Sequence, residues 1–128
     1  MKIRISNTSG ESIYAQLKEQ LKEQLISGEI APDTALPSIR AFAKDLHISV
    51  ITVKRAYEEL EREGYIYTIA QKGSFAAARD NERIKEEYLS QIEERLREIK
   101  RLCRTADIKE DELRRIGSII WEDEDECD

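Results

Sequence analysis

The fold of this chain is decided by residues 36–65, which read LPSIRAFAKDLHISVITVKRAYEELEREGY. Pro37 disfavours helix in the residue before it, and Ser38 is suited to cap a helix that starts directly afterwards. Apolar residues then recur at helical spacing on either side of a short polar interruption. The stretch therefore predicts two helices, 39–46 and 50–63, joined by a tight turn.

The second of these helices has two different faces. Ser49 is placed to cap its start and Gly64 to end it. One face has the spacing of a buried stripe, formed by Val53, Ala56, Tyr57 and Leu60. The first turns of the other face carry Val50, Ile51, Thr52, Lys54 and Arg55. A short helix, a short turn and a basic second helix together indicate a helix-turn-helix.

The start of the second helix allows two interpretations. Apolar Val50 and Ile51 suit contact with thymine methyl groups in a major groove, and Thr52 can bond a base or a phosphate. Alternatively, the two apolar residues pack on a following hairpin, and Lys54 and Arg55 are solvated surface charges. Each residue alone is weak evidence, so the DNA-binding interpretation depends on their combination.

Arg40 lies off the apolar stripe, in the first turn of the first helix. A cation at this end is unfavourable with the helix dipole, so nothing local explains a basic residue there. It is either a solvated surface residue or a contact to a phosphate or a guanine edge. In the second case it acts together with the backbone N–H groups that follow Ser38.

The runs LPSIR and ISVITVKRAYEELEREGYI closely resemble the winged-helix DNA-binding domain of GntR-family bacterial transcription regulators. The resemblance covers roughly the first three-fifths of the chain, and the remainder is similar in size and helical pattern to the family's small YtrA-type branch. It implies a sequence-specific DNA-binding transcription regulator, in this family most often a repressor. It also implies a homodimer that binds a palindromic double-stranded DNA operator.

This resemblance and the residue types together give the expected DNA contacts. The main ones are Arg40, Thr52 and Lys54. Supporting contacts are expected from Ser38, Ser49, Val50, Ile51 and Arg55, and from Lys72 and Gly73 at the tip of the wing.

The residues before the helix-turn-helix are expected to support it. Residues 1–5 alternate polar and apolar and predict a short strand or an ordered arm. Residues 11–27 predict an amphipathic scaffold helix, stopped by Gly28. The connecting turn has Asp33 where the family usually has Gly, and Asp tolerates left-handed geometry.

A β-hairpin, the wing, is predicted after the second helix. Residues 65–69 and 74–77 have strand-like composition, and the tip between them reads Gln71-Lys72-Gly73. The family tip commonly reads Gly-x-Gly, so Gln71 is a departure. A tip with Gly73 lets the backbone approach a phosphate or the minor groove, and Lys72 adds charge. The alternative is a hairpin that only edges the domain.

Two more helices are expected towards the C-terminus. Asp80 is a candidate cap for a helix reaching about Cys103, and Asp107 is a candidate cap for the next. Apolar residues form a stripe along them, namely Ile84, Tyr88, Ile92, Leu96, Ile99, Leu102, Leu113, Ile116, Ile119 and Ile120. Two helices cannot enclose a sizeable core, so the stripe meets either the first domain or a second copy. The resemblance favours dimerisation.

The expected organisation has three parts. These are a winged helix-turn-helix domain at 1–78, a helical dimerisation region at 79–121 and an acidic tail at 122–128. The fold class is mainly α with a small β-hairpin. Residues 1–78 hold 10 basic and 10 acidic side chains and residues 79–128 hold 11 and 17, so the second part accounts for the net charge of −6. The DNA-binding face must therefore be local.

Other functional classes find little support in the sequence. The single His47 has no nucleophile or metal-ligand partner at a useful spacing, and there is no glycine-rich phosphate loop. Cys103 and Cys127 form neither a zinc spacing nor a disulfide framework. We therefore expect no enzyme activity, cofactor or metal. The C-terminal region is too small for a roomy effector pocket, and the sequence does not identify an effector.

The expected location is the cytoplasm, because no apolar run approaches the ~18 residues that span a bilayer and no signal peptide is recognised. The alternative function is a non-catalytic protein-interaction adaptor built on a winged helix. RNA binding is weaker still, because an exposed aromatic platform for unpaired bases is lacking.

Overall fold

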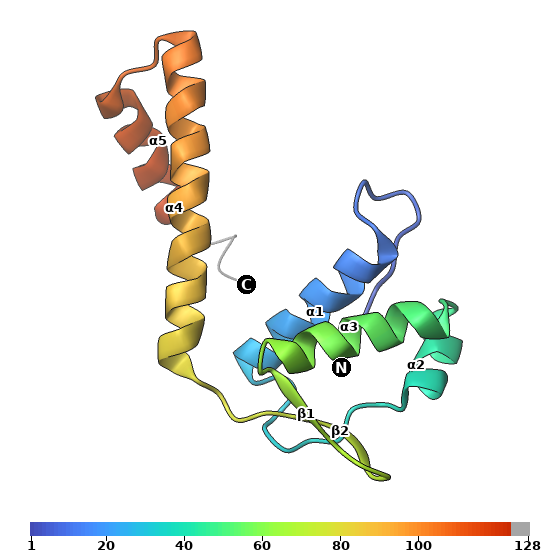
Figure 1. Cartoon of the computed structure of the whole chain (residues 1–128). Coiled ribbons are helices and arrows are strands. Elements are labelled where there is room, and N and C mark those ends of the chain that lie inside the picture. The colour runs from blue at the N-terminus through green and yellow to red at the C-terminus, as the bar shows by residue number, and fades with distance from the viewer. Residues whose placement is uncertain (124–128) are drawn as a thin grey trace. The chain divides into compact units, whose positions relative to one another are not determined.

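The computed structural model describes residues 1–123 and divides the chain into two compact units, Met1–Asp80 and Asn81–Asp128 (Figure 1). Most of the predicted acidic tail, residues 124–128, lies outside the described residues. The first unit contains α1 (Ile13–Ser27), α2 (Ile39–Leu46), α3 (Val50–Arg62), β1 (Ile66–Ile69) and β2 (Gly73–Ala76). The second contains α4 (Asn81–Ala106) and α5 (Glu110–Trp121). The predicted fold class, mainly α with a small β-hairpin, is confirmed.

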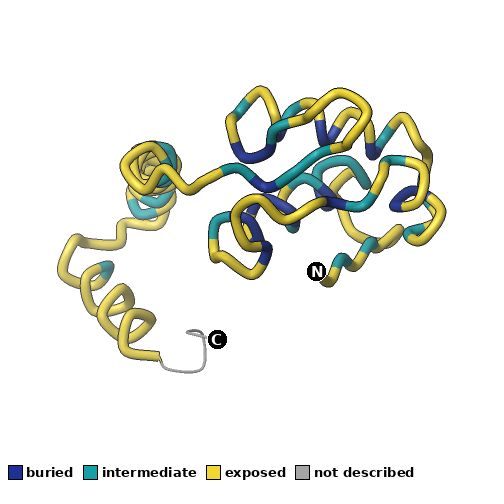
Figure 2. Tube along the Cα trace, turned by 90° about the horizontal axis from the view of Figure 1, so that it is seen from below, coloured by how far each residue is buried: buried dark blue, intermediate teal, exposed yellow. Residues whose placement is uncertain are grey.

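The core of the first unit lies between α1 and α3, which pack side by side, with α2 against α3 (Figure 1). Its largest fully buried side chains are Leu17, Leu21, Val53 and Leu60. The two leucines of α1 come from the helix predicted to be amphipathic, and Val53 and Leu60 come from the stripe predicted for α3. Figure 2 shows the buried positions gathered in this unit, whereas α4 and α5 are exposed along most of their length. Burial of the two stripes against each other fixes the angle at which α3 presents its outer face.

The helix-turn-helix begins and ends at local capping residues. Ser38 Oγ accepts a hydrogen bond from the Ala41 N–H at 3.2 Å, and Ser49 Oγ accepts one from the Thr52 N–H at 3.0 Å. His47, with φ 57°, ends α2 and turns the chain towards α3. The bounds of α2 agree with the prediction, and α3 ends at Arg62, one residue earlier than predicted. Side-chain caps at both helix starts explain this agreement.

The wing is an antiparallel hairpin whose register corrects the predicted tip. Gly73 pairs with Ile69 and belongs to β2, so the connecting residues are 70–72 and not 71–73. Gly73 has φ 110°, a conformation that side-chain-bearing residues rarely adopt. Gln71 takes the left-handed conformation (φ 68°) where the family commonly has glycine. The loss of that glycine therefore has not removed the turn.

The segment before α2 adds a third extended stretch to the wing. Ala35 forms a bridge with Phe75, and the Leu36 N–H donates to the Ser74 carbonyl at 2.9 Å. Asp33 adopts the left-handed conformation expected of it (φ 66°), and its Oδ1 accepts a hydrogen bond from the Tyr67 hydroxyl at 2.7 Å. Strand β2 is thus held from both sides, which ties the wing to the start of α2.

The N-terminal residues form an ordered arm and not a strand. Gln20 of α1 both accepts from the Arg4 N–H at 2.8 Å and donates to the Arg4 carbonyl at 2.6 Å. Gln16 makes the same two bonds with Ser6. Gln24 donates to the Lys2 carbonyl. Four residues of helix rise ~6.0 Å and two residues of extended chain ~6.6 Å, so every fourth helical residue meets every second arm residue.

The helices of the second unit differ from the prediction at the turn between them. Helix α4 continues to Ala106, three residues beyond the predicted end at Cys103. Asp107 does not cap α5: it has φ 55° and lies in the turn, where its carboxylate pairs with Lys109 at 2.7 Å. The cap position is Lys109, whose N–H donates to Glu112 Oε1 at 3.4 Å. Asp107, in the left-handed conformation that Asp tolerates, therefore follows the end of α4 and does not begin α5.

No helix among residues 1–123 is both long enough and apolar enough to cross a membrane.

Candidate nucleic-acid interface

The outer face at the start of α3 presents apolar side chains to solvent. Ile51 is 78% exposed and Val50 is 46% exposed. Ile51 therefore does not pack on the wing, the alternative left open by the sequence. Among the described residues of the first unit, Ile51 is the most exposed large apolar side chain. An uncovered apolar group beside polar and basic neighbours has the character of a binding surface and not of a core.

Thr52 is held in place by the residue that caps the helix. Its Oγ1 lies 2.8 Å from Ser49 Oγ, and its N–H donates to the same oxygen. Thr52 is half-buried, and the contact with Ser49 restricts the orientation of its hydroxyl. When the hydroxyl donates to Ser49, its own oxygen remains an acceptor for a donor on a base or for water.

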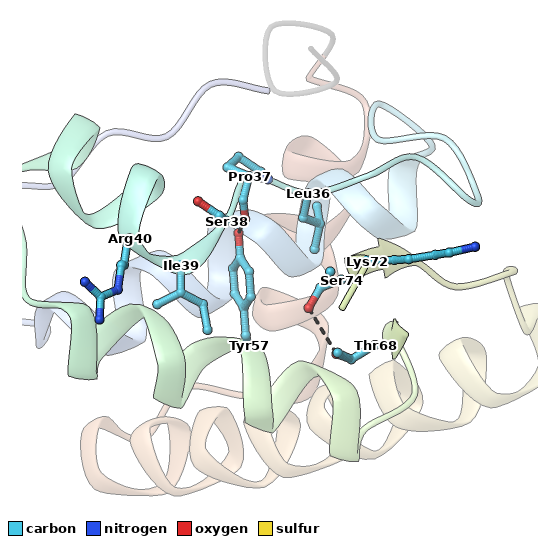
Figure 3. Close-up of a pocket in the computed structure, with 10 residues that line it drawn as sticks. Leu36, Pro37, Ser38, Ile39, Arg40, Tyr57, Thr68, Lys72 and Ser74 are labelled. Carbon is cyan, nitrogen blue, oxygen red and sulfur yellow. Dashed lines mark hydrogen bonds between the residues drawn. The ribbon is translucent and has the colours of Figure 1, made fainter. Parts of the chain in front are cut away.

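A hollow of about 410 Å³ joins the start of α2 to the wing (Figure 3). It brings together four of the predicted site residues from two distant stretches of sequence, namely Ser38, Arg40, Lys72 and Gly73. Figure 3 shows Arg40 and Lys72 at its two sides, with the Tyr57 ring between them. The remaining six predicted residues, 49–52, Lys54 and Arg55, do not line it.

Tyr57 anchors one wall of this hollow. Its hydroxyl donates to the Pro37 carbonyl at 2.8 Å, which ties α3 to the residue before the cap of α2. Burial raises the pKa of Tyr57 well above its ordinary value, so the hydroxyl stays protonated and keeps donating. The bond holds the residue directly before Ser38, the N-cap of α2.

The basic residues near the hollow and at the start of α3 form no ion pairs with the acidic side chains that the structure describes. Within residues 1–123, Arg40, Lys54 and Lys72 have no carboxylate partner. The acidic residues of α3 lie in its second half. Glu59 pairs with Arg62, and the Arg62 guanidinium holds the pKa of that carboxyl below its ordinary value. A near-neutral domain thereby retains a local positive face.

Glu63, just after α3, forms its ion pairs with α1 and not with the basic residues near the hollow. Its carboxylate meets Lys18 Nζ at 2.5 Å and Lys22 Nζ at 3.6 Å, both from α1. Lys22 is buried and lies over the Tyr65 ring at 5.3 Å from its centroid. These contacts are part of the packing of α1 on α3 and leave two of the unit's lysines unavailable to an external anion.

Arg55 has a partner that the sequence did not reveal. Its guanidinium lies over the ring of Tyr14, with the carbon 3.8 Å from the ring centroid. The two residues lie far apart in the sequence, and a tyrosine next to Ile13 in an amphipathic helix carries no signal of such a contact. The arginine lies against Tyr14 of α1 and does not line the hollow.

Two hydroxyl residues of the wing were also missed. Thr68 and Ser74 face each other across the hairpin, with their oxygens 3.0 Å apart, and both line the hollow. They offer donors and acceptors beside Lys72. Their pairing depends on the register of the hairpin. The tip predicted from the sequence was one residue too late, so the pairing of these two hydroxyl groups could not be predicted.

Comparison with known proteins identifies the family. Residues 13–75 match the family described as bacterial regulatory proteins, gntR family. The chain is 34% identical over 97 residues to the HTH-type transcriptional repressor YtrA of Bacillus subtilis, which covers 76% of this chain and 75% of YtrA. The chain belongs to the GntR family. The resemblance inferred from the sequence is thereby confirmed, and the protein is a DNA-binding transcription regulator and not an enzyme.

Solved structures agree with this membership. A transcriptional regulator from Oenococcus oeni superposes with a TM-score of 0.73 at 25% identity, covering 91% of this GntR-family chain and 97% of the other. The DNA-binding domain of AraR in complex with operator ORE1 superposes with a TM-score of 0.50 at 25% identity, covering 60% of this chain and 94% of that one. The first likeness spans most of the chain, and the second spans a part the size of the winged helix.

Proposed function

We propose that this GntR-family regulator acts in the bacterial cytoplasm as a repressor, binding a palindromic operator as a homodimer. The observation that carries the proposal is the exposed start of α3, where Ile51 stands uncovered next to the capped and oriented Thr52. A regulator needs such a face to read base edges. The names of its relatives supply the class of partner, since YtrA is called a repressor and the AraR domain is in complex with an operator.

In this proposal the contacts divide between base reading and positioning. Val50, Ile51 and Thr52 enter the major groove, where apolar groups meet thymine methyls and the hydroxyl meets a base edge. Arg40 and Lys54 bind phosphates on either side and set the register of the helix on the duplex. Ser38 and Ser49 hold the helix starts, while Arg55 adds charge beside α1.

The wing contributes the third part of the contact. Lys72 and Gly73 are exposed and line the hollow shared with Arg40. A phosphate at that hollow is within reach of cations from both α2 and the wing, and Gly73 presents no side chain to a close backbone approach. Residues 1–78 thereby act as the DNA-binding domain.

Dimerisation is proposed for the helical region 79–121. The predicted contact residues are Ile84, Tyr88, Ile92, Leu96, Ile99, Leu113, Ile116 and Ile120. Within the described part of the second unit none of these is buried, and Ile92, Leu96, Ile116 and Ile120 are each at least half exposed. A second copy would cover them. It would also supply the twofold symmetry that places two α3 helices at half-sites ~10 bp apart.

The experiment that tests this function is selection of genomic fragments by the purified full chain at physiological salt, followed by sequencing. An inverted repeat enriched upstream of genes is the expected result, and transcription from such a promoter should fall when the protein is added. Recovery of fragments indistinguishable from a selection without protein would contradict the proposal. Enrichment of a site without twofold symmetry would contradict the homodimer alone.

A further inference from the structure

A hollow of about 370 Å³ lies between α4 and α5 near the turn that joins them. Its apolar lining comes from Leu96, Cys103, Ile108 and Leu113, and its polar lining from Lys100, Arg104 and Glu110. Small-molecule sites range from roughly 300 to 1,000 Å³, so this hollow is at the lower limit for a ligand. Its size and lining suit one large apolar side chain.

Trp121 is the side chain that lacks such a site. It ends α5 and is 88% exposed, the highest value among the large apolar residues of the described chain. An indole has a large apolar surface, ~150–250 Å² when buried, and an N–H that bonds at the edge of an interface. A tryptophan left this open at a helix end is typical of an anchor for a partner.

The hollow cannot receive the Trp121 of its own chain. Helix α5 starts at the hollow, with Glu110 and Leu113 in its wall, and Trp121 is the last residue of the same helix. Twelve residues of α-helix are ~18 Å long, so a continuous α5 keeps the two apart. The occupant must come from another molecule.

The charged residues at the rim of the hollow indicate which molecule supplies the occupant. Within residues 1–123, Lys100 and Arg104 have no carboxylate partner, whereas Glu110 is already paired with Arg114 at 2.5 Å. In the sequence, Trp121 is followed directly by Glu122 and Asp123. The segment that carries the exposed indole therefore also carries the acidic groups that the two free cations require.

We propose that the indole of Trp121 from one copy of this chain enters the hollow between α4 and α5 of a second copy, with Glu122 and Asp123 beside Lys100 and Arg104. Each copy has one such indole and one such hollow, so a twofold pair makes the contact twice. This inference rests on the proposed homodimer and names the contact that anchors it.

The chain contains a single tryptophan, so its fluorescence reports the surroundings of Trp121 alone. The full chain is diluted through the concentration range in which sedimentation equilibrium detects dissociation. The expected result is that the emission maximum moves to longer wavelength over the same range, because the indole leaves an apolar site for water. Dimers whose emission stays that of an exposed indole would overturn the docking of Trp121 and leave the homodimer standing. A monomer at every concentration would overturn the homodimer itself.

Two substitutions in the same helix provide a matched test of the hollow. Leu96 lines it and is 55% exposed, whereas Leu89 is 52% exposed and does not line it. We expect Leu96→Ala to raise the dimer dissociation constant about tenfold and Leu89→Ala to change it less than about twofold. Equal losses in the two variants would contradict the assignment.

The anchor is tested by two replacements of the tryptophan. Trp121→Ala should raise the dimer dissociation constant by at least about 30-fold, and Trp121→Phe should recover most of the loss because it keeps an aromatic ring. Circular dichroism of each variant checks that α4 and α5 still form. A folded Trp121→Ala variant that dimerises as tightly as the parent would overturn the proposal.

Discussion

The guanidinium carbon of Arg55 lies 3.8 Å from the centroid of the Tyr14 ring. The pair joins the outward face of α3 to the first turns of α1, which runs beside it (Figure 1). A cation over an aromatic face in a partly exposed setting contributes about 0.5–1 kcal/mol. The contact fixes where the arginine lies without cancelling its charge, so Arg55 remains able to attract a phosphate.

A double-mutant cycle tests that contact. Tyr14→Leu and Arg55→Gln each remove one partner, and we expect a coupling of about 0.5–1 kcal/mol in the free energy of unfolding measured with urea. Tyr14→Phe keeps the ring and should keep most of the coupling. Strictly additive losses in the cycle would show that the pair does not interact in solution.

The DNA contacts of Thr52 and Lys54 are expected to differ in kind. Thr52→Ala should weaken binding at the cognate site by about 1–3 kcal/mol and leave binding to random DNA nearly unchanged, because a base-edge contact is lost. Lys54→Ala should weaken both and reduce the salt slope by about one, because a phosphate contact is lost. Titrations on both DNAs over a range of salt concentrations separate the two. Equal losses on cognate and random DNA for Thr52→Ala would refute its role in reading bases.

Two glycine-to-alanine substitutions should change stability in opposite directions. Gly73 has φ 110°, and nothing lies within 4 Å of the position of an added Cβ, so Gly73→Ala is destabilising through the backbone alone. The expected loss is about 2 kcal/mol. Gly117 lies inside α5 with equally open space, and its replacement by Ala should stabilise that helix by about 1 kcal/mol. Denaturant unfolding, followed separately in each unit, gives both changes in the free energy of unfolding. A Gly73→Ala variant as stable as the parent would argue against the register of the wing.

The N-terminal arm should depend on the glutamines of α1. Gln20→Ala removes both hydrogen bonds to the Arg4 backbone, and hydrogen exchange at the Arg4 amide should speed up markedly. Exchange at the Ser6 amide, which donates to Gln16, should change less. Glu19→Ala, an exposed neighbour on the same helix, is the control. An Arg4 amide that exchanges equally fast in all three proteins would mean that the arm is not held by these bonds.

The parts of the fold that were predicted correctly are those set by local rules. Ser38 and Ser49 cap the helices they precede, and the stripe of α3 is buried at the expected spacing. Both features are encoded within one or two helical turns. The exposure of Ile51 was not fixed in this way, because the sequence also allowed Ile51 to pack on the wing, and the structure decides against that alternative.

The parts that were missed depend on contacts between distant residues. Nothing local marks Gln20 as the partner of Arg4, since a glutamine on an amphipathic helix is ordinarily solvated. The pairing of Thr68 with Ser74 required the register of the hairpin, and the bridge of Ala35 to Phe75 required the path of the preceding segment. Asp107 was ambiguous for another reason, because Asp is suited both to helix caps and to left-handed turns.

The spacing of the half-sites tests whether two copies bind one palindrome through paired α3 helices. The affinity and stoichiometry of the full chain are measured on the selected inverted repeat, and again after insertion of about half a helical turn, ~5 bp, between the half-sites. We expect two chains per repeat and a large loss of affinity on the altered site, because the second helix then faces the wrong side of the duplex. Equal affinity on the two DNAs, or one chain per repeat, would contradict it.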